Sequence, residues 1–145
     1  ANPMSRRQPF ALLGLLLLAS TAAGWAAAPP LATHVDVLYF HRTARCPTCL
    51  DMEAYAAEAA AHFPAEREAG RILFRAINLD DENARHYEQD YALEFSSVVL
   101  SRRVNGQEAA WTNLPAVWSV VGDKPNFIAY VETEIAGQLE QLPKE

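Results

Sequence analysis

Two cysteines three positions apart constrain this sequence more than any other feature. Cys46 and Cys49 are the only cysteines in the chain, and they stand where an apolar stretch ends and an alanine-rich helical pattern begins. Two thiols separated by Pro47 and Thr48 at a helix start can form a disulfide with little backbone movement. Pro47 suits the first helical turn because it lacks an N–H group that would be unpaired there. We therefore expect a redox-active dithiol at a helix N-terminus.

The helix is expected to make the two thiols chemically unequal. Cys46 should be exposed and should have a lowered pKa, because free amide N–H groups and the helix dipole stabilise its thiolate. Cys49 lies one turn inside the helix, so it should be covered and act as the resolving thiol. His41, Arg42 and Arg45 lie just upstream, with no acidic residue among them. These cations further favour a thiolate at Cys46.

Two other uses of the cysteines are open. A structural zinc site usually needs four ligands, but the chain has no third cysteine and its four histidines show no His-x-x-x-His spacing. An inert structural disulfide would close a very short loop, so its entropic stabilisation would be small. A redox-active pair is favoured over both.

The N-terminal residues have the pattern of an export signal. Residues 1–28 combine a short extension before the first methionine with Arg6 and Arg7, an apolar run over Phe10–Leu18 and a series of small residues. We expect cleavage of this signal; the alternative is that residues 10–28, which carry no charge, remain as an inner-membrane anchor. In either case the folded part is expected to be periplasmic or otherwise exported.

The charge of the chain excludes one class of partner. Its 12 Lys and Arg residues and 18 Asp and Glu residues give a net charge of −6, which becomes −8 when a signal carrying two arginines is removed. This acidic balance argues against nucleic-acid binding. Outside the cytosol, a thiol pair is oxidised unless an electron donor keeps it reduced. A reductase there would need such a donor.

The rest of the chain predicts one α/β domain. Residues 29–35 are assigned to a tether and the start of the first strand, and residues 36–145 to the domain. The expected elements, in chain order, are a strand over 34–40, a helix over 47–63, a strand over 71–79, a short helix ending near 91, strands over 97–103 and 108–112, a short helix over 114–121 and a final helix over 126–142.

These elements predict a central mixed sheet of four strands. The first two strands are joined through a helix, so they should be parallel. Asn105 and Gly106 carry the signal of a hairpin turn, so the last two strands should be antiparallel. The acidic run that begins at Asp80 is expected to cap the short helix that follows it, rather than to bind a metal. The order β-α-β-α-β-β-α predicts helices on both faces.

This order, with Cys-x-x-Cys at the carboxyl end of the first strand, resembles the thioredoxin-like fold. Segments from about Val37 to Leu139 resemble a narrower group, the exported proteins named as a subunit of a nitrophenyl-compound nitroreductase and found with arsenical-resistance systems. The segments are Phe40-His41-x-Thr43-x-Arg45-Cys46-Pro47-Thr48-Cys49, Asn78-Leu79-Asp80-Asp81-x-Asn83, Asp90-Tyr91-x-Leu93, Trp111-x-Asn113-Leu114-x-x-Val117-Trp118 and Gly122-Asp123-Lys124-x-x-Phe127-x-x-Tyr130-Val131.

The resemblance implies a thiol-disulfide oxidoreductase that passes electrons, as a reductase subunit, to a partner or to nitroaromatic or arsenical substrates. Its implied partners are a membrane electron donor or permease and a redox partner protein. No motif for a flavin or a nicotinamide is present, so the Cys46–Cys49 disulfide is expected to be the only redox group. A dithiol supplies two electrons per cycle, so nitro reduction would need repeated recharging.

Alignment with thioredoxins exposes one departure beside the dithiol. It places Ser97 where a cis-proline normally faces the disulfide. Thioredoxins pair a substrate peptide with the backbone of that loop, and the proline keeps metals off the thiols. Ser97 leaves both properties open, and it makes binding of As(III) or Cu(I) by the reduced dithiol easier.

A second departure concerns proton transfer. Thioredoxins carry a buried acid beneath the second cysteine, and here that position falls on Tyr39 or Phe40. Asp51 and Glu53 are interpreted as members of a solvated helix face. His41 is the better candidate for tuning a thiol pKa, with an ordinary surface histidine as the alternative.

Three functional classes follow from the sequence. The first is an exported thiol-disulfide oxidoreductase, the second is a soft-metal or arsenite-binding dithiol protein, and the third is a non-catalytic subunit of a membrane system. Cys46 and Cys49 are the expected catalytic residues, or the ligands if a soft metal binds. The residues expected to tune the thiol pKa or to form a substrate loop are His41, Arg45, Pro47, Thr48 and Ser97.

Overall fold

Four strands form one mixed sheet in the computed structural model, which describes residues 32–144. The strands are β1 (His34–His41), β2 (Ile72–Asn78), β3 (Ser97–Val104) and β4 (Gln107–Asn113). Their order is β2-β1-β3-β4, with β2 parallel to β1 and with antiparallel β1–β3 and β3–β4 pairs. The expected α/β fold with a mixed four-stranded sheet is confirmed.

The β3–β4 hairpin has the turn that its sequence predicts. Asn105 and Gly106 have φ angles of 51° and 77°. A two-residue hairpin turn that matches the twist of its strands needs positive φ at both central positions, which asparagine and glycine tolerate best. The turn places the end of β4, and the chain that follows it, beside the start of β3.

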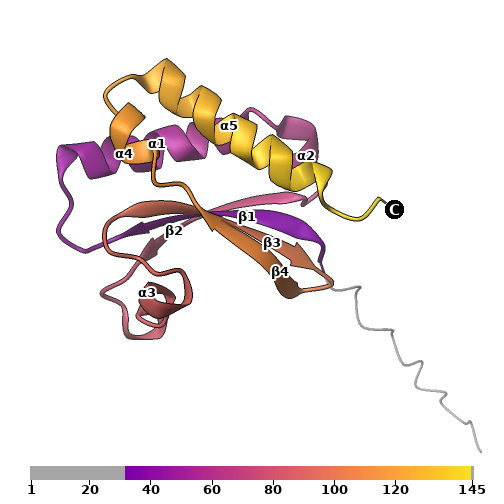
Figure 1. Cartoon of the computed structure of the whole chain (residues 1–145), viewed down its shortest axis with the longest axis horizontal. Helices are drawn as coiled ribbons and strands as arrows, with labels where there is room; N and C mark the ends of the chain where they lie inside the picture. Colours follow the sequence, from indigo (N-terminus) through magenta and orange to yellow (C-terminus); the bar gives the residue numbers. More distant parts are fainter. Residues whose placement is uncertain (1–31, 145) are drawn as a thin grey trace, which may run out of the picture.

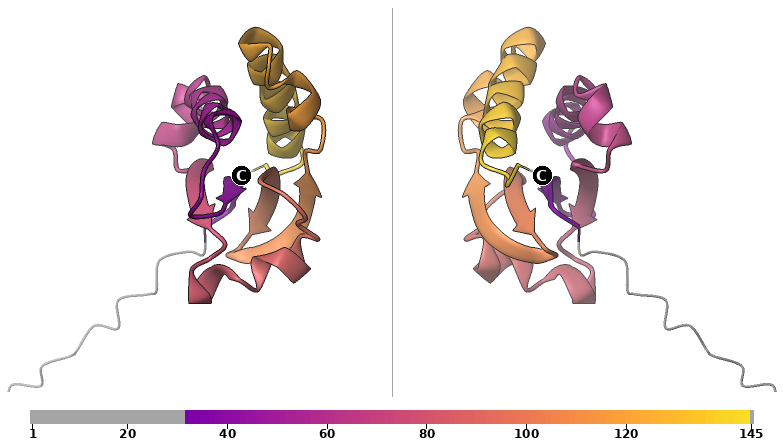
Figure 2. Two further views of the ribbon diagram at one scale, coloured as in Figure 1. Left: turned by 90° about the vertical axis from the view of Figure 1, so that its left-hand side faces the viewer. Right: turned by 90° about the vertical axis from the view of Figure 1, so that its right-hand side faces the viewer.

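Helices cover both faces of the sheet (Figures 1 and 2). They are α1 (Pro47–Ala61), α2 (Pro64–Glu68), the 3-10 helix η1 (Glu82–Ala84), α3 (Tyr87–Asp90), α4 (Val117–Val120) and α5 (Lys124–Glu140). Helices α1 and α5 lie side by side on one face, and α3 lies on the other. The helix expected over 47–63 ends at Ala61, before Pro64, and Pro64 begins the short helix α2, which the sequence analysis did not expect.

Strand β1 supplies both cores because its side chains alternate between the faces. Val35, Val37 and Tyr39 are fully buried in the larger core, beneath α1 and α5. Leu38 and Phe40 are fully buried in the smaller core on the α3 face. The sequence left two candidates, Tyr39 and Phe40, for the position beneath the second cysteine. Tyr39 is the one that faces α1.

The acidic run after β2 does not act as the helix cap that its sequence predicts. Asp81 precedes η1, but its side chain makes no capping hydrogen bond. The Asp80 carboxylate instead accepts a hydrogen bond from the backbone N–H of Thr43, at 2.8 Å. The run therefore connects to the loop before α1, 37 positions earlier in the chain.

The predicted signal or anchor over residues 1–28 lies outside the described residues, as does the start of the tether. Residues 32–144 contain no helix with the length and apolar character needed to cross a membrane.

Candidate redox site

A disulfide joins Cys46 and Cys49 at the N-terminus of α1, directly after the loop that leaves β1. The two Cα atoms lie 5.1 Å apart. Cys46 is exposed and Cys49 is partly covered, as the position of each in the helix predicts. Pro47 occupies the first turn, and Thr48 is exposed beside it.

Cys46 is itself the N-cap residue of α1. Its backbone is extended, with φ −85° and ψ 159°, and its Sγ accepts a hydrogen bond from the backbone N–H of Cys49 at 3.1 Å. A sulfur in this position faces the unpaired N–H groups and the positive end of the helix dipole. When the disulfide is reduced, this environment stabilises a thiolate on Cys46.

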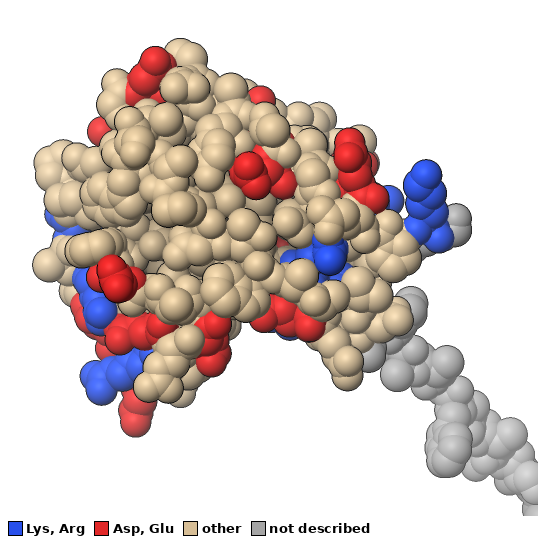
Figure 3. All heavy atoms as spheres, in the orientation of Figure 1, with Lys and Arg blue, Asp and Glu red and all other residues tan. Residues whose placement is uncertain are grey.

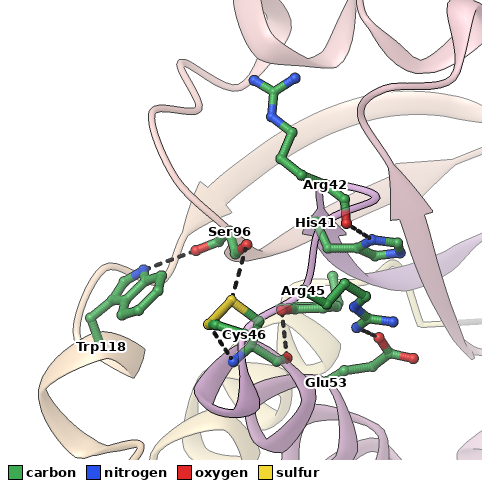
Figure 4. The surroundings of a disulfide bond; sticks show 9 residues. His41, Arg42, Arg45, Cys46, Glu53, Ser96 and Trp118 are labelled. Carbon is green, nitrogen blue, oxygen red and sulfur yellow. Dashed lines mark hydrogen bonds and ion pairs between the residues drawn. A yellow bond between two sulfur atoms is a disulfide. The ribbon is translucent and has the colours of Figure 1, made fainter.

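The side chain that faces Cys49 is that of Ser96, one residue before the serine expected there. Ser96 Oγ lies 3.9 Å from Cys49 Sγ and can donate a hydrogen bond to it (Figure 4). Ser97 Oγ donates instead to the carbonyl of Phe95, at 2.9 Å. Both serines belong to the loop that enters β3, so the sequence located the loop but not the residue.

Tyr39 lies beneath the second cysteine. Its hydroxyl donates a hydrogen bond of 2.6 Å to the backbone carbonyl of Cys49. Burial raises the pKa of Tyr39, and hydrogen bonds with the side chains of Ser96 and Arg45 oppose this rise. Tyr39 and Ser96 therefore connect the covered cysteine to a polar network where thioredoxins have a carboxylate.

The cations upstream of the cysteines are paired with acids, contrary to the sequence expectation. Arg45 forms an ion pair with Glu53 of α1 (Figure 4). Arg42 pairs with Asp80 at 3.2 Å and with Glu88 at 2.6 Å. Glu53 therefore has a cationic partner that the sequence did not suggest, and the net positive charge beside the disulfide is smaller than the sequence suggests.

The loop before the disulfide is tied to the end of β2. Asp80 accepts hydrogen bonds from the backbone of Thr43 and from the side chain of Arg42. Asn78 donates a further hydrogen bond to Thr43 Oγ1, at 2.9 Å. The hydrogen bond from Thr43 is the main reason that the pKa of Asp80 is lowered.

His41 ends β1 beside the site, but it bonds to the backbone rather than to sulfur. Its Nδ1 lies 2.9 Å from the carbonyl oxygen of Arg42, and its ring stacks on Tyr39 with the centroids 5.9 Å apart. The guanidinium of Arg45 lies 5.8 Å from the centroid of the same tyrosine ring. His41 and Arg45 thus both lie next to the Tyr39 ring.

Two hollows open around the loop that carries Ser96, and both are lined by Glu94, Phe95 and Trp118. The larger has a volume of about 580 Å³ and the smaller about 240 Å³. Trp118 Nε1 donates a hydrogen bond of 2.9 Å to the carbonyl of Ser96, which fixes the indole next to the residue that faces Cys49 (Figure 4). Ser97 lines the larger hollow and His41 the smaller.

The described residues offer no ready-made metal centre. Within residues 32–144, no group of three or more His, Cys, Asp and Glu side chains is placed to hold a metal ion. A soft metal or metalloid at this site would rest on the two sulfur atoms of the reduced dithiol.

Sequence reasoning missed three residues around the disulfide. Ser96, Phe95 and Trp118 were not expected at the site, although Trp118 belongs to a quoted motif. Phe95 is 68% exposed and Trp118 is 42% exposed. Large apolar side chains that remain exposed beside a reactive pair are a signal of a binding surface, but their exposure is visible only in the structure.

Comparison with protein-family models finds no match for this chain, and comparison with curated proteins finds none either. Among solved structures, the chain is similar to one described as the structure of a malarial protein. The identity is 14% and the TM-score 0.43, and the match covers 70% of this chain and 97% of the other.

Proposed function

We propose that this protein is an exported thiol-disulfide oxidoreductase with a thioredoxin-like fold, and that Cys46 and Cys49 are its catalytic pair. The observation that carries the proposal is the position of Cys46: its exposed sulfur caps α1 and is bonded to the partly covered Cys49. An inert structural disulfide has no need of an exposed sulfur at a helix N-terminus. A reactive thiol is activated by that position.

The reaction begins with the reduced dithiol. The Cys46 thiolate attacks one sulfur of a partner disulfide, which forms a mixed disulfide and releases the other partner sulfur as a thiolate. The released partner thiolate takes up the proton of the Cys49 thiol, and the Cys49 thiolate attacks the Cys46 sulfur. The second partner thiolate leaves, and the Cys46–Cys49 disulfide is restored. Two electrons have then passed from the protein to the partner.

Ser96 and Tyr39 support the second step. Ser96 Oγ can donate a hydrogen bond to the Cys49 sulfur, which stabilises its thiolate as the proton leaves. The hydroxyl of Tyr39 is bonded to the Cys49 carbonyl and to the Ser96 side chain. Ser96 is the group that touches the reacting sulfur, and Tyr39 acts as a positioning residue.

The direction of electron flow and the partners are proposed from the sequence. The export signal predicted from the sequence supports a dithiol in the periplasm or outside the cell, where a membrane electron donor would keep it reduced. The resemblance to the nitroreductase subunits supports a reductase that serves a nitroaromatic or arsenical substrate. It also supports a permease or other membrane protein as the docking partner.

A second candidate function is binding of As(III) or Cu(I) by the reduced dithiol. The favouring observation is that a serine hydroxyl, that of Ser96, faces the Cys49 sulfur, and that no proline stands at Ser96 or Ser97 to shield the thiols from metals. Soft thiolate ligands select such ions. In this function both cysteines act as ligands, and neither has a distinct role.

Variants of the two cysteines separate the candidate functions. Replacement Cys46→Ser is expected to abolish turnover of a small disulfide substrate. The variant Cys49→Ser keeps the attacking thiol but lacks the resolving one, so it should accumulate a mixed disulfide, detected by mass spectrometry. An equal loss of turnover in both variants, without a trapped mixed disulfide, together with tight As(III) binding by the wild type, would favour the metal-binding function.

The reduction potential of the pair tests the proposed direction. Equilibration with dithiothreitol or glutathione should give a value near or below about −270 mV, the level of a reductase. A value near about −120 mV belongs to an oxidant of other proteins' thiols, and it would overturn the assignment as a reductase.

A further inference from the structure

The larger hollow beside the disulfide is lined by groups that attract positive charge. Its apolar walls include the aromatic rings of Phe95 and Trp118, whose centroids lie 6.5 Å apart in an edge-to-face arrangement. The faces of aromatic rings carry partial negative charge and attract cations. No Lys, Arg or His side chain lines this hollow.

Two polar groups in the hollow can accept hydrogen bonds. Asn113 Oδ1 is buried without a hydrogen-bond partner, and a buried acceptor of this kind costs free energy until a donor reaches it. Glu94 lines the hollow and takes part in none of the ion pairs among residues 32–144. A donor with a positive charge would satisfy both groups.

The nearest cation lies on the other side of the shared wall. Arg42 and His41 line the smaller hollow, and Glu94, Phe95 and Trp118 line both hollows. Arg42 is paired with both Asp80 and Glu88, so its charge is compensated. In Figure 3, uncharged side chains cover most of the upper part of the end where α4 and the start of α1 lie, and charged side chains gather below it.

We propose that the larger hollow binds an arginine side chain of the partner polypeptide. This arginine would lie next to the partner disulfide that Cys46 attacks. A guanidinium can stack flat on an aromatic ring and donate several hydrogen bonds at its edge. It therefore fits Trp118 or Phe95, with its donors directed to Glu94 and Asn113. The net charge of −6 over the whole chain favours approach of a basic segment.

The occupant is a polypeptide because the surface around the disulfide is apolar and exposed. Leu50, directly after Cys49, is 52% exposed, and Phe95 and Trp118, next to and hydrogen-bonded to Ser96 respectively, are exposed as well. Trp118, which lines the hollow, donates a hydrogen bond to the carbonyl of Ser96, and the side chain of Ser96 faces Cys49. The hollow therefore lies close to the Cys46–Cys49 pair. This inference names the partner chemistry of the proposed oxidoreductase and depends on that function.

The test uses short capped peptides with one cysteine that carries a thionitrobenzoate mixed disulfide. Each peptide has one arginine at a position within three residues of the cysteine, and its matched control has citrulline there, which keeps the shape and removes the charge. The reduced protein releases coloured thionitrobenzoate, so absorbance gives the rate. Reduction of bis(2-hydroxyethyl) disulfide, which is small and neutral, reports the dithiol chemistry separately.

We expect the best arginine peptide to react about fivefold or more faster than its citrulline control at low ionic strength. The ratio of the arginine-peptide rate to the citrulline-peptide rate should fall toward one in Glu94→Gln, a conservative change at an exposed position, and in Trp118→Leu. Glu82→Gln removes a charge from an exposed residue that does not line the hollow, and its ratio should match the wild type.

Each other outcome has a defined meaning. A ratio near one at every position, with normal reduction of the small disulfide, overturns the arginine site and leaves the oxidoreductase intact. An equal fall in Glu82→Gln and Glu94→Gln also overturns it, because the preference then reflects net charge alone. Failure to reduce the small disulfide overturns the proposed function itself.

Discussion

Ser96 and Ser97 differ in a single contact that matters for the chemistry. Ser96 Oγ faces the Cys49 sulfur, whereas Ser97 Oγ is bonded to a backbone carbonyl. We predict that Ser96→Ala slows release of the mixed disulfide about fivefold, which is what a loss of about 1 kcal/mol would cause. It should also raise the pH at which that step reaches half its maximal rate. Ser97→Ala should change neither; equal effects in both variants would contradict the assignment.

Tyr39 should contribute measurably to the stability of the site. Tyr39→Phe removes the hydrogen bond to the Cys49 carbonyl and is expected to lower the free energy of unfolding by about 1 kcal/mol in a urea titration. Because the pKa of Tyr39 is raised in the folded protein, its contribution is complete below pH 10 and declines as the pH rises through the folded value. A difference between variant and wild type that grows above pH 10 would contradict this account.

Asp80 has the opposite pH dependence. Its pKa is lowered in the folded protein, chiefly by the hydrogen bond from the backbone of Thr43, so its contribution to stability is complete above about pH 4 and is lost as the pH falls through the folded value. Asp80→Asn should therefore be less stable than the wild type at pH 7. The difference between the two proteins in urea titrations should shrink as the pH falls below about 4. A difference that is constant from pH 7 to pH 3 would show that the charge is not responsible.

Helix α1 has two opposing effects on the pKa of Cys46. Its N-terminus stabilises a thiolate on Cys46, but its Glu53 compensates the charge of Arg45 beside that thiol. Glu53→Gln should leave Arg45 uncompensated and lower the pKa of Cys46 by up to about one unit, measured from the rate of alkylation against pH. Glu58→Gln, which breaks the ion pair with Lys124 further along the same helix, is the control. A similar shift in both variants would contradict the local effect.

The regular elements were predictable because their patterns are local. Each strand boundary lies within one residue of its prediction, since alternating or β-branched runs and the Asn105-Gly106 turn define the sheet directly. The end of α1 before Pro64 was predicted, but the short helix α2 was missed, because a proline that stops one helix can also start the next. The contact between Asp80 and Thr43 spans 37 positions, and no local pattern predicts it.

The site was predictable in its centre and not in its surroundings. The cysteine pair follows from spacing and helix position, both of which the sequence contains. Which serine faces the sulfur depends on the path of the loop before β3, and a one-residue shift there changes the side chain that reaches it. The exposure of Phe95 and Trp118 likewise depends on how distant segments pack.

At the level of the whole molecule, the fold should tolerate reduction of the disulfide. Two hydrophobic cores on opposite faces of the sheet hold the domain, and the disulfide closes a loop of only a few residues. Its entropic stabilisation is at most about 2 kcal/mol. We expect the reduced protein to unfold cooperatively in urea. Its free energy of unfolding should be lower than that of the oxidised protein by no more than this amount. Loss of the cooperative transition on reduction would show that the bond is structural.

The hydrogen bond between Trp118 and the Ser96 carbonyl also makes the molecule an optical reporter of its own state. It holds an indole within two hydrogen-bonded contacts of the Cys49 sulfur. Disulfides quench the emission of nearby tryptophans, whereas thiols quench it less. Turnover should therefore be visible as a change in intrinsic fluorescence, without any dye or label, and the signal should disappear in Trp118→Phe.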